Sequence, residues 1–266
     1  MRKNIPFIHN YCNRWCERCP FTDSCAVFER EMNDTEEEDE DDDPIKSALK
    51  KVSKNFKAAI KMLRERAAEM GIDVDNIPEE EQKAIEVEME LERKATEEDP
   101  LVTLCEQYHD LASDILYDEV LWTKIADELI AQDQMGIVPR KEMNQRLKVL
   151  KDSKEIICWH MRFIQVKFMR AISGLFDRFH DEDEVQSDSN GSAKIALIAV
   201  ADSQKAWLDL SRIVLEEDLI LPILGILSAI NKAAKEKFPR AMEFVRPGFD
   251  EVEKIASSAE NLAINS

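Results

Sequence analysis

Glycine is scarce in this chain: 6 of its 266 residues are glycine, and 9 are proline. Sandwiches, barrels and nucleotide-binding α/β folds use glycine at their turns, so this composition argues against all three classes. Charged residues make up 34% of the chain and aromatic residues 7%, a balance that suits long amphipathic helices. Hydrophobic residues make up 44%, which is enough to build a sizeable core. The composition therefore predicts an all-α protein.

Apolar residues recur at helical spacing after the first 44 residues, in segments bounded by start and stop signals. Asp43-Pro44 and Asp99-Pro100 each place an N-cap acid before a proline, and Gly71 provides a stop. The predicted helices cover residues 45–70, 78–95, 99–132, 141–179, 193–216 and 218–237. The fourth of them is apolar on two faces, which is typical of a helix at the centre of a bundle. We therefore expect a bundle of about five to seven helices.

The charge pattern divides the chain further. Nine of the ten residues from Asp34 to Asp43 are acidic, and like charges at that density favour a solvated linker. The helix that follows is rich in lysine and arginine, and the next one is rich in glutamate, so both are expected to be peripheral. The first predicted part is a small four-cysteine module (1–32), followed by the acidic linker (33–43) and the peripheral helices (44–98). The bundle core (99–240) comes next, and a C-terminal turn with a short helix (241–266) follows it.

Four cysteines near the N-terminus have the spacing C-x3-C-x2-C-x5-C, and they are Cys12, Cys16, Cys19 and Cys25. Thiols this close in sequence can converge on one tetrahedral centre, and a bound metal would order a segment that has few apolar residues. Zn²⁺ is the usual ion of a structural four-cysteine site, and a [4Fe–4S] cluster takes the same ligands. Unligated or disulfide-bonded thiols are the alternative, and His9 could replace one cysteine. We predict a metal-binding module here.

Two segments far apart in the chain resemble a family of uncharacterised bacterial all-helical proteins. They are Tyr11-Cys12-Asn13-Arg14-Trp15-Cys16-Glu17-Arg18-Cys19 and Phe244-Val245-Arg246-Pro247-Gly248-Phe249-Asp250, which bracket helices that include Trp207. The resemblance implies a bacterial origin and a shared architecture, and it transfers no activity.

The first three cysteines also resemble the triplet of radical S-adenosylmethionine enzymes. However, Arg18 stands where that family usually has an aromatic residue, and helices rather than a βα barrel are predicted downstream.

Polar residues in the predicted bundle helices form a second candidate site, and they are Glu106, His109, His160, Lys167 and Asp202. Glu106 and His109 have the E-x-x-H spacing by which a ferritin-like bundle presents ligands to a di-iron site, but no second such pair exists. Buried charges must be paired, so we expect either structural salt bridges or a polar pocket between the helices. The sequence contains no G-x-S-x-G, no H-E-x-x-H and no phosphate-binding glycine loop, and therefore favours a role that is not enzymatic.

A formal net charge of −19 disfavours nucleic acid and anionic membranes as partners, although the basic helix or the N-terminal module could still contact nucleic acid. The predicted contacts of a protein partner are Arg14, Trp15, Arg18 and Phe21, because arginine and aromatic side chains commonly anchor interfaces.

The longest apolar run has twelve residues, too few to span a bilayer. Cysteines without an export signal indicate a cytoplasmic protein.

The sequence therefore predicts a metal-stabilised helical protein that binds or scaffolds an unidentified partner. The competing hypothesis is an iron–sulfur redox protein or enzyme, in which the cysteine cluster transfers electrons and the bundle provides a polar pocket.

Overall fold

The computed structural model describes residues 4–36, 44–71, 73, 76–176, 183–213 and 217–250. Within these residues the secondary structure is helical and contains no strand, which confirms the predicted all-α class. The chain divides into two compact units. The first consists of Met1–Ile5 and Cys16–Leu91, and the second consists of Pro6–Trp15 and Glu92–Ser266.

The first unit contains short helical turns and the charged helices. In chain order its elements are the 3-10 helices η2 (Cys16–Arg18) and η3 (Thr22–Ser24), then α1 (Ala26–Glu36), α2 (Pro44–Glu69) and the larger part of α3 (Glu79–Glu97). As predicted, α2 begins at Pro44 and ends just before Gly71, whose φ of +74° is a left-handed conformation that glycine adopts without strain. Because α1 extends to Glu36, the first residues of the predicted acidic linker are helical, and residues 37–43 lie outside the described part of the chain.

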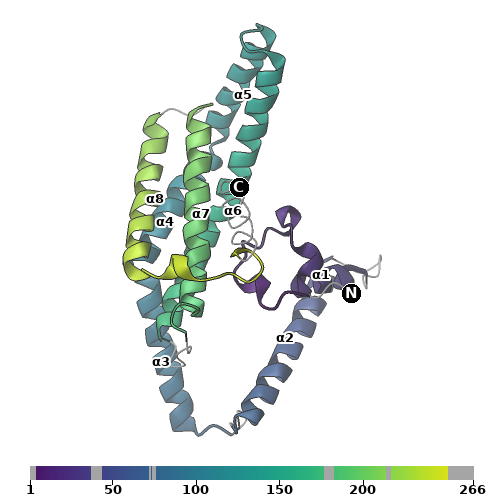
Figure 1. Cartoon of the computed structure of the whole chain (residues 1–266), viewed down its shortest axis with the longest axis vertical. Coiled ribbons are helices and arrows are strands. Elements are labelled where there is room, and N and C mark those ends of the chain that lie inside the picture. The colour runs from purple at the N-terminus through teal and green to yellow at the C-terminus, as the bar shows by residue number, and fades with distance from the viewer. Residues whose placement is uncertain are drawn as a thin grey trace, which may run out of the picture. The chain divides into compact units, whose positions relative to one another are not determined.

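The second unit is the helical bundle. Its elements are η1 (Ile8–Asn10), α4 (Pro100–Leu116), α5 (Glu119–Gln134), α6 (Arg140–Ser173), η4 (Gly174–Phe176), α7 (Asp188–Ser211), α8 (Glu217–Lys237) and η5 (Ala241–Glu243). The helices α4, α6, α7 and α8 pack on one another, and the contact between α6 and α7 is the most extensive (Figure 1). The helix α5 runs back along the first half of α6. The helix α6 contacts α4 and α7, and α8 contacts the same two helices, so these contacts do not make α6 more central than its neighbours.

Large aromatic side chains fill the core of the bundle. Trp207 of α7, Tyr108 of α4 and Phe168 of α6 are completely buried, and the indole Nε1 of Trp207 donates a hydrogen bond to the Tyr108 hydroxyl at 3.3 Å. Burial of one large apolar side chain stabilises a fold by about 1.5–3 kcal/mol relative to exposure. These side chains therefore give the bundle a core that contains none of the four N-terminal cysteines.

The predicted helix over residues 99–132 is instead two helices, α4 and α5, separated at Tyr117 and Asp118. The carboxylate of Asp118 accepts a hydrogen bond from the Leu121 amide at 2.9 Å and so caps the start of α5. Trp122 Nε1 donates to the Ile115 carbonyl at 2.8 Å, which satisfies an acceptor at the end of α4. Periodicity alone did not reveal this break, because apolar residues on both sides of it contribute to the same core.

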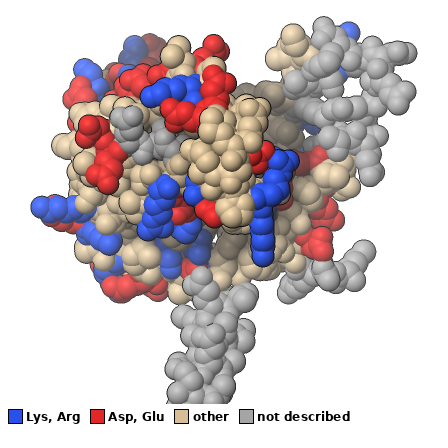
Figure 2. All heavy atoms as spheres, turned by 90° about the horizontal axis from the view of Figure 1, so that it is seen from above, with Lys and Arg blue, Asp and Glu red and all other residues tan. Residues whose placement is uncertain are grey.

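The surface is highly charged, and acidic and basic side chains are interspersed on the face shown in Figure 2. Some of these side chains form ion pairs one helical turn apart, such as Lys83–Glu79 and Lys205–Asp209. Each such pair stabilises its helix by about 0.2–0.5 kcal/mol. Among the described helices, none combines the length and the apolar character that crossing a bilayer requires.

Candidate functional site

Three of the four N-terminal cysteines lie in the first unit, in a segment built from tight turns. The amide of Cys19 donates to the Cys16 carbonyl at 3.1 Å, and the amide of Cys25 donates to the Thr22 carbonyl at 3.2 Å. Cys25 directly precedes α1, whose Glu29 amide donates to the Cys25 carbonyl at 3.0 Å. The N-terminus of a helix carries a positive partial charge, which suits a negatively charged ligand atom.

Backbone amides point at two of the cysteine sulfur atoms. The Arg14 amide donates to Cys12 Sγ, and the Phe21 amide donates to Cys19 Sγ, each at 3.4 Å. Arg14 achieves this with a positive φ of 58°, an uncommon conformation for a residue with a side chain. Hydrogen bonds from amides to sulfur are a means by which proteins tune thiolate ligands. The same amide contacts would stabilise thiolates at Cys12 and Cys19 if these residues held a metal.

All four cysteines are free thiols and half-buried, but Cys12 belongs to the second unit, whereas Cys16, Cys19 and Cys25 belong to the first. In its thiol form Cys12 also lies within 3.5 Å of the His9 carbonyl. Among the described residues, no group of three or more histidine, cysteine, aspartate or glutamate side chains is arranged to hold a metal ion.

Residues 6–15 belong to the second unit, where they pack against α6 and α7, and residues 16–32 belong to the first unit. The indole of Trp15 stacks on that of Trp159 with their ring centroids 5.2 Å apart. Trp159 Nε1 donates to the Asn13 carbonyl at 2.8 Å, and Lys167 Nζ donates to the Asn10 carbonyl at 3.1 Å. The predicted site residue Lys167 therefore holds the N-terminal segment in place.

Two segments far apart in the chain, one containing Tyr11 and the other Phe244, meet at the start of α7. The ring of Tyr11 lies 4.6 Å from that of Phe244, and the Tyr11 hydroxyl donates to Asp188 at 3.0 Å. Both rings pack over Gly191, where an added Cβ would lie 2.4 Å from the Tyr11 ring and 2.8 Å from the Phe244 ring. Only glycine allows this close approach.

A buried ion cluster fixes the C-terminal segment to α7. Lys194 Nζ lies 2.7 Å from a carboxylate oxygen of Asp250 and 2.7 Å from the Phe244 carbonyl, to which it donates a hydrogen bond. Arg246 binds the other Asp250 oxygen through Nε and Nη2 at 3.0 and 2.8 Å. Burial alone would raise the pKa of Asp250, but the hydrogen bonds from Arg246 and Lys194 outweigh it and lower that pKa to about 2. The sequence analysis missed Lys194, although a lysine inside the apolar run of residues 192–200 was a usable signal.

The predicted partner contacts have different environments. Arg14 and Arg18 are exposed, Phe21 is half-buried, and Trp15 is half-buried against Trp159. Arg14 and Trp15 belong to the second unit, and Arg18 and Phe21 belong to the first.

The five predicted polar residues of the bundle are also distributed among different partners. Glu106 accepts a hydrogen bond from Gln165 at 3.0 Å, His109 contacts the neighbouring Asp110, and Lys167 binds Asn10 as described above. Asp202 is exposed. In the described part of the chain, no hydrogen bond or ion pair joins any two of the five residues.

His160 is the most buried of these five residues, with 2% of its surface exposed. Neither ring nitrogen has a hydrogen-bond partner among the described residues, and burial lowers the pKa of His160 to about 4. The imidazole is therefore neutral near pH 7. A di-iron site needs several carboxylates and histidines around one centre, and His160 has no such group of ligand side chains around it in the described part of the chain.

Comparison of the chain with protein-family models, with curated proteins and with solved structures finds no match.

Proposed function

We propose that the chain is a metal-stabilised helical protein that binds or scaffolds a protein partner. The observation that carries the binding role is the exposed apolar face of α2. Along this helix, apolar residues recur every three or four positions, and they are Ile45, Leu49, Val52, Phe56, Ile60 and Leu63. Each is between 37% and 71% exposed, so the described residues of the first unit leave this face of the 26-residue helix largely uncovered.

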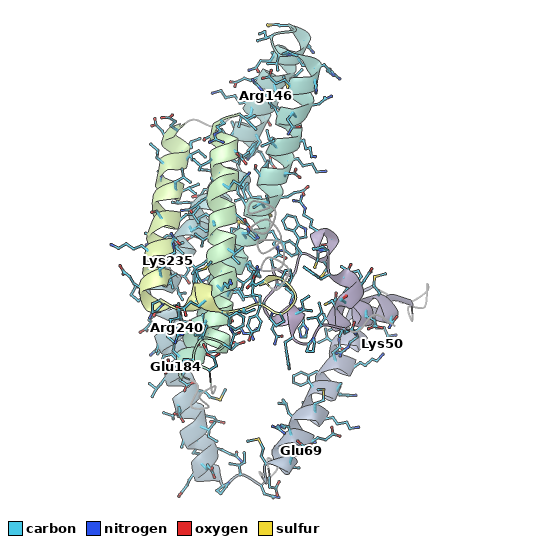
Figure 3. All side chains as sticks on the ribbon, in the orientation of Figure 1. Lys50, Glu69, Arg146, Glu184, Lys235 and Arg240 are labelled. Atoms are coloured by element: carbon cyan, nitrogen blue, oxygen red, sulfur yellow. The ribbon has the colours of Figure 1, made fainter. Side chains whose placement is uncertain are left out.

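The opposite face of α2 is basic. Lysines such as Lys50, Lys57 and Lys61 lie between the apolar positions in sequence. Figure 3 labels Lys50 in the first part of α2 and Glu69 at its last residue. Exposed apolar patches rimmed by charges are typical of protein–protein interfaces, because such a patch gains free energy when a partner covers it. A partner with an apolar ridge and acidic flanks would complement both faces. Arg14, Arg18 and Phe21 are proposed as additional contacts.

The metal is proposed to be held by Cys12, Cys16, Cys19 and Cys25. Three residues separate Cys12 from Cys16, so the chain itself keeps these sulfur atoms near each other. The amide donors to Cys12 and Cys19 support thiolate ligands at both positions. Zn²⁺ would supply structural order to a segment with few apolar residues, whereas a [4Fe–4S] cluster in the same place would supply electron transfer.

Metal analysis tests the first part of this proposal. Mass spectrometry of the protein purified anaerobically from its native source is expected to find one Zn²⁺ per chain, and the four thiols are expected to resist alkylation until a chelator is added. Brown colour with broad visible absorbance would instead favour the iron–sulfur protein. If the reduced protein contains neither metal and all four thiols react freely, the metal-binding role is wrong.

Site-specific photo-crosslinking tests the binding role. A benzoylphenylalanine placed at Phe56, on the apolar face, is expected to form a covalent adduct with a protein in the cells that make this chain. The same group at Lys61, five residues further along and on the basic face, is the matched control. Equal adduct yields at the two positions, or adducts with nucleic acid only, would contradict an apolar protein-binding face.

A further inference from the structure

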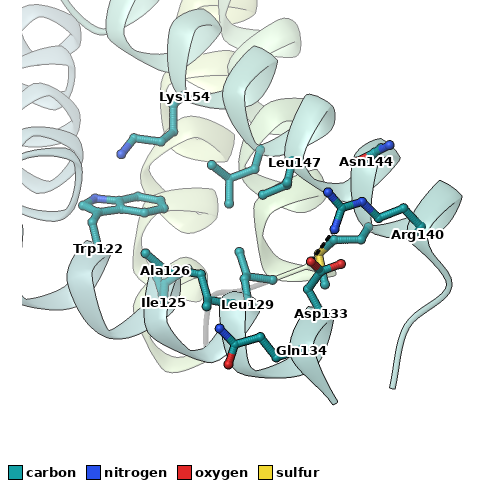
Figure 4. Close-up of a pocket in the computed structure, with 13 residues that line it drawn as sticks. Trp122, Ile125, Ala126, Leu129, Asp133, Gln134, Arg140, Asn144, Leu147 and Lys154 are labelled. Atoms are coloured by element: carbon teal, nitrogen blue, oxygen red, sulfur yellow. Dashed lines mark hydrogen bonds and ion pairs between the residues drawn. The ribbon is translucent and has the colours of Figure 1, made fainter. Parts of the chain in front are cut away.

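A long groove lies between α5 and the first half of α6, with a volume of about 530 Å³ (Figure 4). Small-molecule sites have volumes of roughly 300–1,000 Å³, so the groove is large enough for a ligand. All the residues that line it belong to the second unit, and none of them is a cysteine. This site is therefore separate from the proposed metal and partner sites and does not depend on them.

The walls of the groove are mostly apolar. Ile125 and Leu129 contribute from α5, and Met143, Leu147 and Leu150 contribute from α6. On α5 the lining extends from Trp122 to Gln134, which corresponds to a length of about 18 Å along the helix. An apolar groove of this length can hold an extended hydrocarbon chain along the helix.

The two ends of the groove differ in charge. At the end near the α5–α6 turn, Arg140 and Asp133 form an ion pair and neutralise each other. At the other end, Lys154 Nζ lies 3.4 Å from the centroid of the Trp122 ring. Lys154 forms no ion pair with a carboxylate in the described part of the chain, and burial lowers the pKa of its ammonium group. One end of the groove therefore presents a partly buried cation without an anion.

We propose that this groove binds an amphiphile with one anionic head group and an unbranched apolar tail, such as a long-chain monocarboxylate. The head group binds Lys154 beside Trp122, and the tail follows the apolar wall towards Leu129 and Met143. A charged hydrogen bond to the Lys154 ammonium supplies the anion that this partly buried cation lacks. A cationic amphiphile would be repelled at the same point, and an uncharged one would leave the ammonium unpaired.

Titration of the full-length protein with dodecanoate below its micelle concentration tests this proposal. Isothermal titration calorimetry is expected to show saturable binding with one site per chain. Dodecyltrimethylammonium has the same tail with the opposite charge and is expected to bind at least about tenfold more weakly, because a hydrogen bond to a charged group contributes roughly 1.5–3 kcal/mol. Dodecyl phosphate, titrated in parallel, distinguishes a carboxylate preference from a preference for any anionic head group.

Two variants and a control locate the site. Lys154→Met keeps the length of the side chain and removes its charge, so it is expected to weaken dodecanoate binding about tenfold. Ala126→Trp fills the groove from an exposed position on α5 and is expected to abolish binding. Lys148→Met removes an exposed lysine of α6 that does not line the groove, and is expected to leave binding unchanged. Circular dichroism melting confirms that each variant is folded.

Three results would overturn the proposal. The first is no saturable dodecanoate binding, and the second is equal binding of dodecanoate by Lys154→Met or Ala126→Trp. The third is a dimer in sedimentation experiments that Ala126→Trp dissociates, because a second copy of the chain would then occupy the groove.

Discussion

At the scale of single residues, the bundle treats buried polar groups in two ways. Lys194 is buried with its ammonium group bound to Asp250 and to backbone carbonyls, so its charge is compensated. His160 is buried with no hydrogen-bond partner among the described residues, so it remains neutral instead. The first arrangement fixes the C-terminal segment, and the second makes the stability of the bundle sensitive to pH.

We predict that His160→Leu removes a pH-dependent part of the free energy of unfolding. The pKa of His160 is about 4 in the folded protein, whereas an unfolded histidine has a pKa of about 6.5. Between these values the unfolded chain binds more protons, so the stability is full above pH 6.5 and is lost as the pH falls towards 4. The wild-type protein is expected to lose about 2 kcal/mol more than the variant between pH 7 and pH 5, as measured by urea denaturation.

Ser192→Ala is a suitable control for this experiment, because Ser192 is also completely buried and has no hydrogen-bond partner among the described residues, but it does not titrate. Its pH dependence is expected to match that of the wild type. If His160→Leu shows the same pH dependence as the wild type, the imidazole is not buried in its neutral form.

We also predict that Gly191→Ala destabilises the bundle by about 1–3 kcal/mol, because the new methyl group would overlap the rings of Tyr11 and Phe244. Thermal denaturation measures the effect. The matched control is Gly225→Ala in α8, where nothing lies within 4 Å of the added Cβ. That control is expected to be neutral or to stabilise the helix by roughly 0.5–1 kcal/mol. Equal effects of the two substitutions would show that residues 6–15 do not pack on α7.

At the scale of elements, the helices could largely be predicted from periodicity and from their start signals. The Asp99-Pro100 start is confirmed, since the Asp99 carboxylate accepts a hydrogen bond from the Leu101 amide at 2.9 Å. The interruption at Asp118 was missed because no proline or glycine marks it. Two local features mark the break: Asp118 caps the start of α5, and Trp122 donates a hydrogen bond to a carbonyl at the end of α4. Both depend on side-chain geometry, which a hydrophobic pattern does not contain.

The role of Asp118 as a cap can be tested directly. Asp118→Ala is expected to destabilise the start of α5 by about 1 kcal/mol, because the Leu121 amide loses its acceptor. Hydrogen exchange should then be faster at Leu121 and at neighbouring amides of the first turn, and unchanged at the buried centre of α6. Asp118→Asn keeps a capping oxygen and is expected to restore protection. Fast exchange in both variants would mean that the negative charge, and not the cap, stabilises this turn.

At the scale of the whole molecule, the contact between distant segments could not be predicted from the sequence. Tyr11 and Phe244 each lie in a short motif, but nothing in either motif indicates that the two rings meet over Gly191. Cys12 belongs to the second unit, and Cys16, Cys19 and Cys25 belong to the first, a division that the cysteine spacing does not indicate. The shared metal site therefore stays a prediction. Long-range packing of this kind depends on the bundle surface that α6 and α7 create together, which no local pattern encodes.

The separation of a bundle core from the cysteines leads to a prediction about the whole chain. Cys16→Ser is expected to lose the proposed metal while it keeps most of its helical ellipticity, because the core around Trp207, Tyr108 and Phe168 contains none of the four cysteines. Metal analysis and far-UV circular dichroism of the purified variant measure the two effects separately. Cys158→Ser, at an exposed cysteine of α6, is the matched control and is expected to keep the metal. Wholesale loss of ellipticity in Cys16→Ser would contradict the independence of the bundle, since a core buried on this scale should hold the helices together without the metal.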